Sequence, residues 1–286
     1  MNKKKILLTG SSGFIGKNVL FFLGKSFDIV EVSRSSNYDI DNLNSLLKID
    51  NIDIVIHAAA ETFIPQSFED PYRFYKFNVN ASLNVAEFCR IKKVDKLIYL
   101  NTYPYGVPKC NPIDENHIIS PHSPYTKSKM IAEKLLFQYL EKEVNITSLR
   151  IFNPYGYFQK EDFLIPTIVK QALSGDIIKV KDIRPKRDYL YIEDLISLLK
   201  NILNVSNSEG IYNVGTGKSY SISEIISVIE VILNKKLYTK VSEKHRDNEV
   251  LDCYADITKA TSKFNWSPTI NLLDGVKKYL SWVKNN

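Results

Sequence analysis

Apolar positions along the first half of the chain follow two alternating patterns. Short apolar runs are typical of buried strands, and longer stretches with an apolar residue every third or fourth position are typical of helices. The runs predict strands at 6–9, 28–33, 52–57, 96–101 and 146–152, and the longer stretches predict helices at 14–23, 71–91 and 124–140. Strands that alternate with helices of this length predict a right-handed, doubly wound parallel sheet.

The second half of the chain has a different pattern. After Asn153 the sequence becomes irregular and rich in Pro, Tyr and Asp, and it predicts short helices at 221–233, 257–264 and 272–284. We therefore expect an α/β fold, a Rossmann-type doubly wound parallel sheet with a smaller mixed α/β C-terminal lobe. The predicted division places 1–153 in the Rossmann domain and 154–286 mainly in the lobe, with a segment near 189–214 returning to the sheet.

A glycine-rich turn follows the first predicted strand, in the sequence Thr9-Gly10-Ser11-Ser12-Gly13-Phe14-Ile15-Gly16. The first glycine permits a tight turn, the second lets backbone approach a pyrophosphate, and the third allows the helix to pack closely on the sheet. Small residues also follow the third strand, where they either leave room for the same ligand or open a helix. The turn predicts a dinucleotide site that includes Gly10, Ser12, Gly13, Phe14, Ile15 and Gly16, with Ala58, Ala59 and Ala60 beside it.

A phenol and an ammonium group are spaced four residues apart in the segment Tyr125-Thr126-Lys127-Ser128-Lys129. That spacing places Tyr125 and Lys129 on one face of the predicted helix. A Tyr side chain has a pKa of ~10, so it needs a neighbouring positive charge to exchange protons near neutrality. A dinucleotide site together with such an acid predicts an oxidoreductase that acts on a hydroxyl or carbonyl group. The dinucleotide is expected to bind to residues 1–153.

The composition of the chain argues against a nucleic-acid partner, a metal site and membrane association. The net charge is +6, but the lysines are spread along the chain, so the charge indicates a solvated surface and no nucleic-acid partner. Three cysteines far apart favour a reducing cytoplasm, and the four histidines show no metal-ligand spacing, so no metal is expected. The first apolar run is too short for a signal peptide or a membrane span, and we expect a cytoplasmic protein with no membrane association.

Further motifs occur in the order found in one enzyme family. They are His57-Ala58-Ala59-Ala60, Asn78-Val79-Asn80-Ala81-Ser82, Arg150-Ile151-Phe152-Asn153-Pro154-Tyr155-Gly156, Arg187-Asp188-Tyr189, Tyr212-Asn213-Val214-Gly215 and Asn265-Trp266-Ser267-Pro268. With the glycine turn and the Tyr–Lys pair, they cover almost the whole chain. The chain resembles the extended short-chain dehydrogenases/reductases, the NAD-dependent epimerase/dehydratase family that acts on nucleotide sugars.

The resemblance implies a catalytic set. Tyr125 would exchange a proton with a sugar oxygen, and Lys129 would supply the positive charge and hydrogen-bond the nicotinamide ribose. A Ser or Thr at the end of the preceding strand would bind the reacting oxygen. Thr102 is the choice here, although its spacing to Tyr105-Gly106 is one residue shorter than usual, which keeps Asn101 as a lesser candidate.

The resemblance also implies binding residues. Asn78 would belong to the cofactor site and support the active-site backbone or a proton relay, although a buried structural Asn is equally consistent with the sequence. Asn153, Arg187 and Arg246 would contact the nucleotide-diphosphate sugar, since a guanidinium fork suits phosphate. Arg187 could instead pair with Asp188, and Arg246-Asp247-Asn248 stands where the family has Arg-Pro-Gly. His57 is expected to be a packed residue, and a homodimer is expected through helices 71–91 and 124–140.

The end of the second strand indicates the cofactor. NAD-specific members have an acidic residue there, whereas this chain has Ser33-Arg34. A guanidinium group favours a 2′-phosphate, so NADP(H) is predicted over NAD(H), although Arg34 could instead stack on adenine or point to solvent. Asp39 and Ile40 resemble the pair that contacts the adenine ring.

The two residues that directly follow Thr102 reduce the number of reactions that the family resemblance allows. Dehydratases of the family have an Asp-Glu pair there and bifunctional epimerase-reductases have a Cys, whereas this chain has Tyr103-Pro104. A 4-epimerase of the family would usually retain NAD tightly, whereas Arg34 favours a dissociable NADPH, so the sequence predicts reduction of the 4-keto group of a nucleotide-linked 4-keto-6-deoxy sugar. The alternative is a nucleotide-sugar 4-epimerase with tightly bound NAD, and a non-enzymatic nucleotide sensor would have no need of the Tyr–Lys pair.

Overall fold

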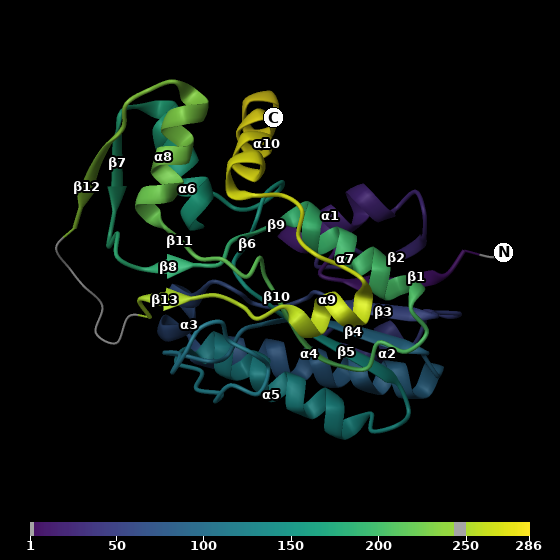
Figure 1. Ribbon diagram of the computed structural model, residues 1–286. Helices are drawn as coiled ribbons and strands as arrows, with labels where there is room; N and C mark the ends of the chain where they lie inside the picture. The colour runs from purple at the N-terminus through teal and green to yellow at the C-terminus, as the bar shows by residue number, and fades with distance from the viewer. Residues whose placement is uncertain (1–2, 243–249) are drawn as a thin grey trace. The chain divides into compact units, whose positions relative to one another are not determined.

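The computed structural model describes residues 3–242 and 250–286, and the chain folds into two compact units. The first unit comprises Met1–Gly106, Ile119–Ile151 and Lys200–Tyr212, and the second comprises Val107–Ile118, Phe152–Leu199 and Asn213–Asn286 (Figure 1). Each unit therefore contains segments that are far apart in the sequence.

A six-stranded sheet forms the centre of the first unit, with the strand order β10-β5-β4-β3-β1-β2. Its strands are β1 (Lys5–Thr9), β2 (Asp28–Val32), β3 (Ile54–His57), β4 (Lys96–Thr102), β5 (Asn145–Ile151) and β10 (Gly210–Val214). The pairs β2–β1, β1–β3, β3–β4 and β4–β5 are all parallel. The order reverses direction between β1 and β3, which is the topology of a doubly wound Rossmann sheet, so the predicted fold class is confirmed.

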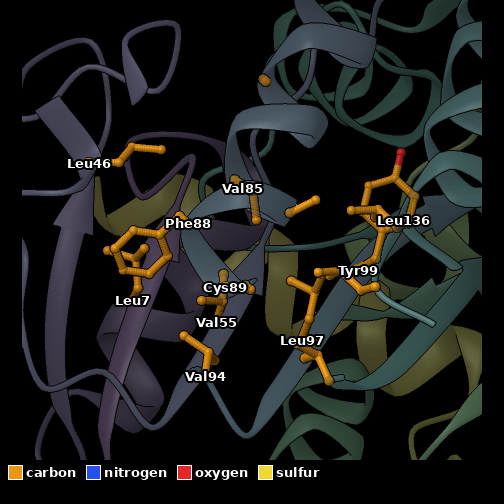
Figure 2. Close-up of a cluster of buried hydrophobic side chains, with 14 of the residues drawn as sticks. Leu7, Leu46, Val55, Val85, Phe88, Cys89, Val94, Leu97, Tyr99 and Leu136 are labelled. Carbon is orange, nitrogen blue, oxygen red and sulfur yellow. The ribbon is translucent and has the colours of Figure 1, made fainter. Parts of the chain in front are cut away.

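Helices cover the sheet of the first unit. They are α1 (Phe14–Leu23), α2 (Leu43–Leu46), α3 (Ile64–Glu69), α4 (Pro71–Lys92) and α5 (Pro124–Tyr139). In Figure 1, α4 and α5 run alongside one another over one face of the sheet. The buried faces of α4 and α5 pack on strand residues such as Leu7, Val55 and Leu97 in one hydrophobic cluster (Figure 2). Such all-apolar strands can only be stable with both faces covered.

Two lysines of the first unit hydrogen-bond carbonyl groups at the C-terminal end of helix α7 (Ile192–Asn204). Helix α7 ends with unpaired carbonyl groups, as every helix does. Lys4 Nζ donates to the Leu203 carbonyl at 2.8 Å, and the buried Lys96 Nζ donates to the Ile202 carbonyl at 2.9 Å. Cations at a helix C-terminus also interact favourably with its dipole. These contacts fix the segment that leads into β10.

The second unit is more regular than the sequence suggested. It contains the helices α6 (Leu164–Ser174), α8 (Ile222–Leu233), α9 (Thr258–Phe264) and α10 (Leu272–Asn285), together with most of α7. Its strands are β6 (Pro154–Tyr155), β7 (Ile177–Val180), β8 (Lys186–Arg187), β9 (Leu190–Tyr191), β11 (Tyr220–Ser221), β12 (Tyr238–Val241) and β13 (Asp252–Cys253). The expectation of an irregular stretch after Asn153 is wrong for α6 and α7, whose apolar residues recur at the three- and four-residue spacing of an amphipathic helix but were not recognised as helical.

Across residues 3–242 and 250–286, no helix combines the length and apolar character that a membrane crossing needs.

Candidate active site

The glycine turn joins β1 to α1 with its backbone pressed against the segment after β3. Gly10 has a φ of +71°, and a Cβ there would lie 2.7 Å from the Ala59 nitrogen. A Cβ on Gly16 would lie 2.2 Å from the Gly10 carbonyl oxygen, so only glycine fits either position. Helix α1 begins at Phe14 after Gly13, which has no side chain to cap the first N–H groups. This strand, turn and helix N-terminus match the arrangement that holds a dinucleotide pyrophosphate.

His57 ties the end of β3 to its neighbours. Its Nδ1 is 2.7 Å from Thr9 Oγ1 and its Nε2 is 3.0 Å from Ser82 Oγ, and the side chain is fully buried. Burial, together with the charge of Lys129, lowers the pKa of His57 well below its usual value, so the ring is neutral. Thr9 Oγ1 also accepts a hydrogen bond from the Ala59 nitrogen at 3.2 Å. His57 therefore packs the segment Ala58, Ala59 and Ala60 beside the glycine turn.

Tyr125, Thr102 and Lys129 come together at the C-terminal end of β4 and the start of α5. The capping box of Ser123 and Thr126 begins α5, which fixes Tyr125 in the first turn. The side chain of Thr102 interacts with the phenol of Tyr125 and lowers its pKa. Lys129 follows one turn later, buried, with its Nζ 4.0 Å from the ring centroid of Tyr99. The structure thus joins the three residues that the sequence proposed as a catalytic set.

The electrostatics of this set differ from the expectation. Burial raises the pKa of Tyr125 to about 12, and the interaction with Thr102 offsets this rise only in part. Burial also lowers the pKa of Lys129 to about 7, against the opposing effect of Glu133. The expectation that Lys129 brings the pKa of Tyr125 down toward neutrality is therefore not met here, because desolvation disfavours both charged forms. Tyr125 is a protonated phenol at neutral pH.

Asn101 and Thr102 are adjacent on β4 but contact different partners. Asn101 Nδ2 donates to Glu133 Oε2 at 2.8 Å, and its Oδ1 accepts from the Thr102 nitrogen at 2.8 Å. Glu133 also forms a buried ion pair with Arg150, with Nη2 to Oε1 at 2.7 Å. Asn101 is thus bound in a structural network, and Thr102 is the member of the pair that reaches Tyr125.

The network around Glu133 was not predicted from the sequence. Besides Arg150 and Asn101, the carboxylate accepts a hydrogen bond from Ser148 Oγ at 2.6 Å. Arg150 Nη1 donates to the hydroxyl of Tyr105 at 3.0 Å, so the charges are fully hydrogen-bonded, as burial requires. The available signal was the spacing of Tyr125, Lys129 and Glu133, which at four-residue steps places all three on one face of α5.

Asn78 links three elements of the site. Its Oδ1 accepts from the Glu61 nitrogen at 2.8 Å, and its Nδ2 donates to the Glu61 carbonyl at 3.2 Å and to Ser128 Oγ at 2.9 Å. Ser128 Oγ in turn donates to the carbonyl of Tyr125 at 2.8 Å. The buried amide therefore positions the backbone after β3 and the first turn of α5, the supporting role that the sequence left open.

Arg34 follows β2 and forms an ion pair with Glu61, which also pairs with Arg73. The Arg34 guanidinium is 5.9 Å from the ring centroid of Phe77. Asp39 is exposed, and Ile40 is buried in the hydrophobic cluster with its carbonyl bound by Asn84 Nδ2 at 2.9 Å. Ile40 thus anchors the segment after β2, while Arg34 and Asp39 are exposed at its surface.

The proposed substrate residues belong to the second unit or lie outside the described residues. Asn153 Nδ2 donates to the Asp188 carbonyl at 2.9 Å, and Arg187 Nη1 donates to the Val250 carbonyl at 2.5 Å. The Asp188 carboxylate accepts four hydrogen bonds, from Thr216 N and Oγ1, Gly217 N and Ala255 N. Arg246 lies outside the described residues. The Asp188 carboxylate therefore connects residues 216–217 with Ala255 within this unit.

Over the described part of the chain, no group of three His, Cys, Asp or Glu side chains is arranged to hold a metal ion.

Known proteins resemble this chain over nearly its whole length. Residues 6–215 match the NAD dependent epimerase/dehydratase family. A UDP-glucuronate 4-epimerase of Thermodesulfobacterium geofontis is 30% identical, with 98% of this chain and 96% of the relative covered. A dTDP-4-dehydro-6-deoxyglucose reductase of Escherichia coli is 29% identical, with 99% and 98% covered. The solved structure of RMD from Pseudomonas aeruginosa complexed with NADPH is 27% identical, with a TM-score of 0.90, covering 99% of this chain and 100% of that one. These matches confirm the resemblance drawn from the motifs.

Proposed function

The chain belongs to the NAD dependent epimerase/dehydratase family, and on this premise we propose that it is an NADP(H)-dependent reductase of the 4-keto group of a nucleotide-linked 4-keto-6-deoxy sugar. The observation that carries the proposal is the interaction of the Thr102 side chain with the phenol of Tyr125, with Lys129 one helical turn away. A phenol with a pKa of about 12 keeps its proton at neutral pH, so Tyr125 is in the form that can donate a proton.

The residues of the first unit divide the work of this reaction. The glycine turn and the N-terminus of α1 would hold the pyrophosphate, and Lys129 would bind the nicotinamide ribose through its ammonium protons. When bound, a reduced nicotinamide supplies the hydride for the C4 carbon of the sugar. Tyr125 then donates its proton to the C4 oxygen, which becomes the hydroxyl of the product. Thr102 holds that oxygen in line with the phenol through its own hydroxyl.

Arg34 supports the choice of NADP(H). It stands at the end of β2, where an acidic residue would accept hydrogen bonds from the adenosine ribose of NAD. Its side chain is 75% exposed, so the guanidinium is accessible to a 2′-phosphate despite its ion pair with Glu61. The related Pseudomonas aeruginosa structure is a complex with NADPH. Asp39 and Ile40, which follow β2, would contact the adenine ring.

The second unit would bind the rest of the substrate. Asn153 and Arg187 are the described residues that we assign to the diphosphate and its sugar, together with Arg246. Arg187 has a guanidinium that can give two hydrogen bonds to one phosphate.

We also propose that two copies of the chain pair through α4 and α5. The outer sides of these helices carry partly exposed apolar side chains, namely Leu83, Ile91, Ile131 and Tyr139. Tyr139 on α5 donates to Glu87 Oε2 on α4 at 2.7 Å, which places these side chains on one continuous surface. An exposed apolar stripe of this kind is a candidate subunit interface.

The second candidate function is a 4-epimerase that retains NAD. The relative that is 30% identical carries that activity in its name, which is the observation in favour. The two functions are separated by offering the purified protein nucleotide-linked 4-keto-6-deoxy sugars with NADPH or NADH, and offering UDP-hexoses without added cofactor. Oxidation of NADPH with the keto sugars alone supports the reductase. Interconversion of UDP-hexoses by the protein as purified supports the epimerase.

A further inference from the structure

Two arginines from different elements share one carboxylate beside the glycine turn. Arg34 lies after β2, Glu61 lies after β3, and Arg73 lies in the first turn of α4. Arg34 and Arg73 both direct Nη2 to Glu61 Oε1, and the Arg73 distance is 2.8 Å. The group has a net charge of +1, in place of the +2 that the arginines alone would give.

Glu61 is the fixed member of this group. Both its backbone N–H and its carbonyl are hydrogen-bonded to the buried amide of Asn78, at 2.8 and 3.2 Å. Its side chain is 13% exposed, whereas those of Arg34 and Arg73 are 75% and 41% exposed. Arg34, the most exposed of the three, has the most freedom to turn toward a ligand, while Glu61 remains in place.

A phosphate approaching Arg34 meets this fixed carboxylate as well. A phosphate monoester carries a charge of about −1.5 to −2 at neutral pH, and it is repelled by Glu61 at the same time as it is attracted by Arg34. Glu61 also competes with the phosphate for the guanidinium donors. A ribose with a free 2′-hydroxyl has no such charge, so it experiences neither effect. Arg73 offsets part of the competition because it remains paired with Glu61 when Arg34 turns away.

We propose that Glu61 is a specificity-determining residue that limits the preference for NADP(H) over NAD(H). Arg73 restores part of this preference, because its ion pair with Glu61 offsets part of the competition with the phosphate. This inference rests on the proposed function, in which Arg34 receives the 2′-phosphate. Glu61 then competes with the phosphate for the guanidinium group of Arg34. The discrimination between the two cofactors is set by three charged residues from three elements.

The test measures binding without turnover. Dissociation constants for NADPH and NADH, and for adenosine 2′,5′-bisphosphate and AMP as fragments, are determined by calorimetry for the wild type, Glu61→Gln, Arg73→Gln and the double variant. Glu61→Gln is expected to tighten NADPH and the bisphosphate roughly fivefold, the upper range for a solvent-accessible ion pair, with NADH and AMP unchanged. Arg73→Gln is expected to weaken NADPH by a smaller factor, and this loss should vanish in the Glu61→Gln background.

Controls separate this inference from the function beneath it. Glu161→Gln removes another carboxylate, the partner of Lys170 in the second unit, and should change no constant. Arg34→Ala should weaken NADPH and the bisphosphate. If Arg34→Ala has that effect but Glu61→Gln leaves the NADPH to NADH ratio unchanged, or shifts both cofactors equally, the role of Glu61 is overturned while the reductase proposal stands. If Arg34→Ala leaves NADPH binding intact, the assignment of the 2′-phosphate to Arg34 is itself wrong.

Discussion

The side chain of Thr102, at the end of β4, interacts with the phenol of Tyr125, in the first turn of α5. The interaction joins a strand end and a helix start, two elements that are each fixed by neighbours. It lowers the pKa of Tyr125 while desolvation raises it, and desolvation is the larger effect. A buried phenol that holds its proton and already points at a second hydroxyl is arranged to deliver that proton to an oxygen placed between them.

Tyr125→Phe should remove most of the turnover and leave the fold intact. The ring still packs against Phe74, 6.5 Å away between centroids, and only the acidic proton is lost. General acid catalysis contributes about 10²–10⁴-fold, so kcat should fall by that factor with little change in NADPH affinity. Steady-state rates and a fluorescence titration measure the two effects. Tyr238→Phe, at an exposed tyrosine of the second unit, is the control, and near-wild-type turnover in Tyr125→Phe would exclude the proposed acid.

Substitutions at the two neighbouring strand residues should have different consequences. Thr102→Val removes the hydroxyl that orients the reacting oxygen, and it should lower kcat about tenfold or more while Thr102→Ser retains most of the rate. Asn101→Ala instead deprives the buried Glu133 of a donor, which costs about 1–3 kcal/mol of unfolding free energy. Thermal melts and initial rates distinguish them. A loss of kcat in Asn101→Ala at unchanged stability, with Thr102→Val fully active, would reverse the assignment.

Lys129 should make the stability of the protein depend on pH. Its pKa is about 7 in the folded protein and ~10.4 in the unfolded chain, so between these values only the unfolded chain holds the proton. The contribution of Lys129 to stability is therefore complete above ~10.4 and is lost as the pH falls through about 7. Lys129→Met should be stabilised relative to the wild type most at about pH 6, with the difference shrinking toward about pH 10. Urea unfolding at both ends of this range measures it, and a constant difference would show that Lys129 titrates normally.

A charge on the outer side of α4 or α5 should separate the proposed dimer. Leu83→Glu and Ile131→Glu place a carboxylate on side chains that are 37% and 41% exposed in the single chain. Burying an unpaired charge in an interface is costly, so both variants should elute as monomers in size-exclusion chromatography with light scattering. Val231→Glu, on α8 of the second unit, is the matched control. A monomeric wild type, or variants that remain dimeric, would contradict pairing through these helices.

The regular part of the fold and the local motifs could be predicted from the sequence. Strand β1, the helix from Phe14 to Leu23 and the segment around Tyr125 all have periodic patterns or fixed spacings, which are properties of neighbouring residues. Helices α6 and α7 were missed although their apolar residues recur at helical spacing, because the abundance of Pro, Tyr and Asp after Asn153 favoured an irregular structure.

Contacts between distant residues could not be predicted in the same way. The pairing of Arg34 with Glu61, and the bonds of Asn78 to Glu61 and Ser128, depend on which strand ends meet in space. The pKa of Tyr125 depends on burial, which the spacing of Tyr125 and Lys129 does not reveal. These features explain why Tyr125, Thr102 and Lys129 could be proposed from the sequence, whereas their protonation states and supporting residues could not be predicted.

The stoichiometry of cofactor and sugar tests the central claim most directly. Protein freed of bound nucleotide is incubated with a nucleotide-linked 4-keto-6-deoxy sugar and NADPH, and the loss of NADPH absorbance is compared with the amount of reduced sugar nucleotide separated by anion exchange. A reductase should consume one NADPH for each sugar reduced, and Tyr125→Phe should lower both quantities together. Interconversion of two sugar nucleotides with no net loss of NADPH would contradict the reductase and identify an epimerase.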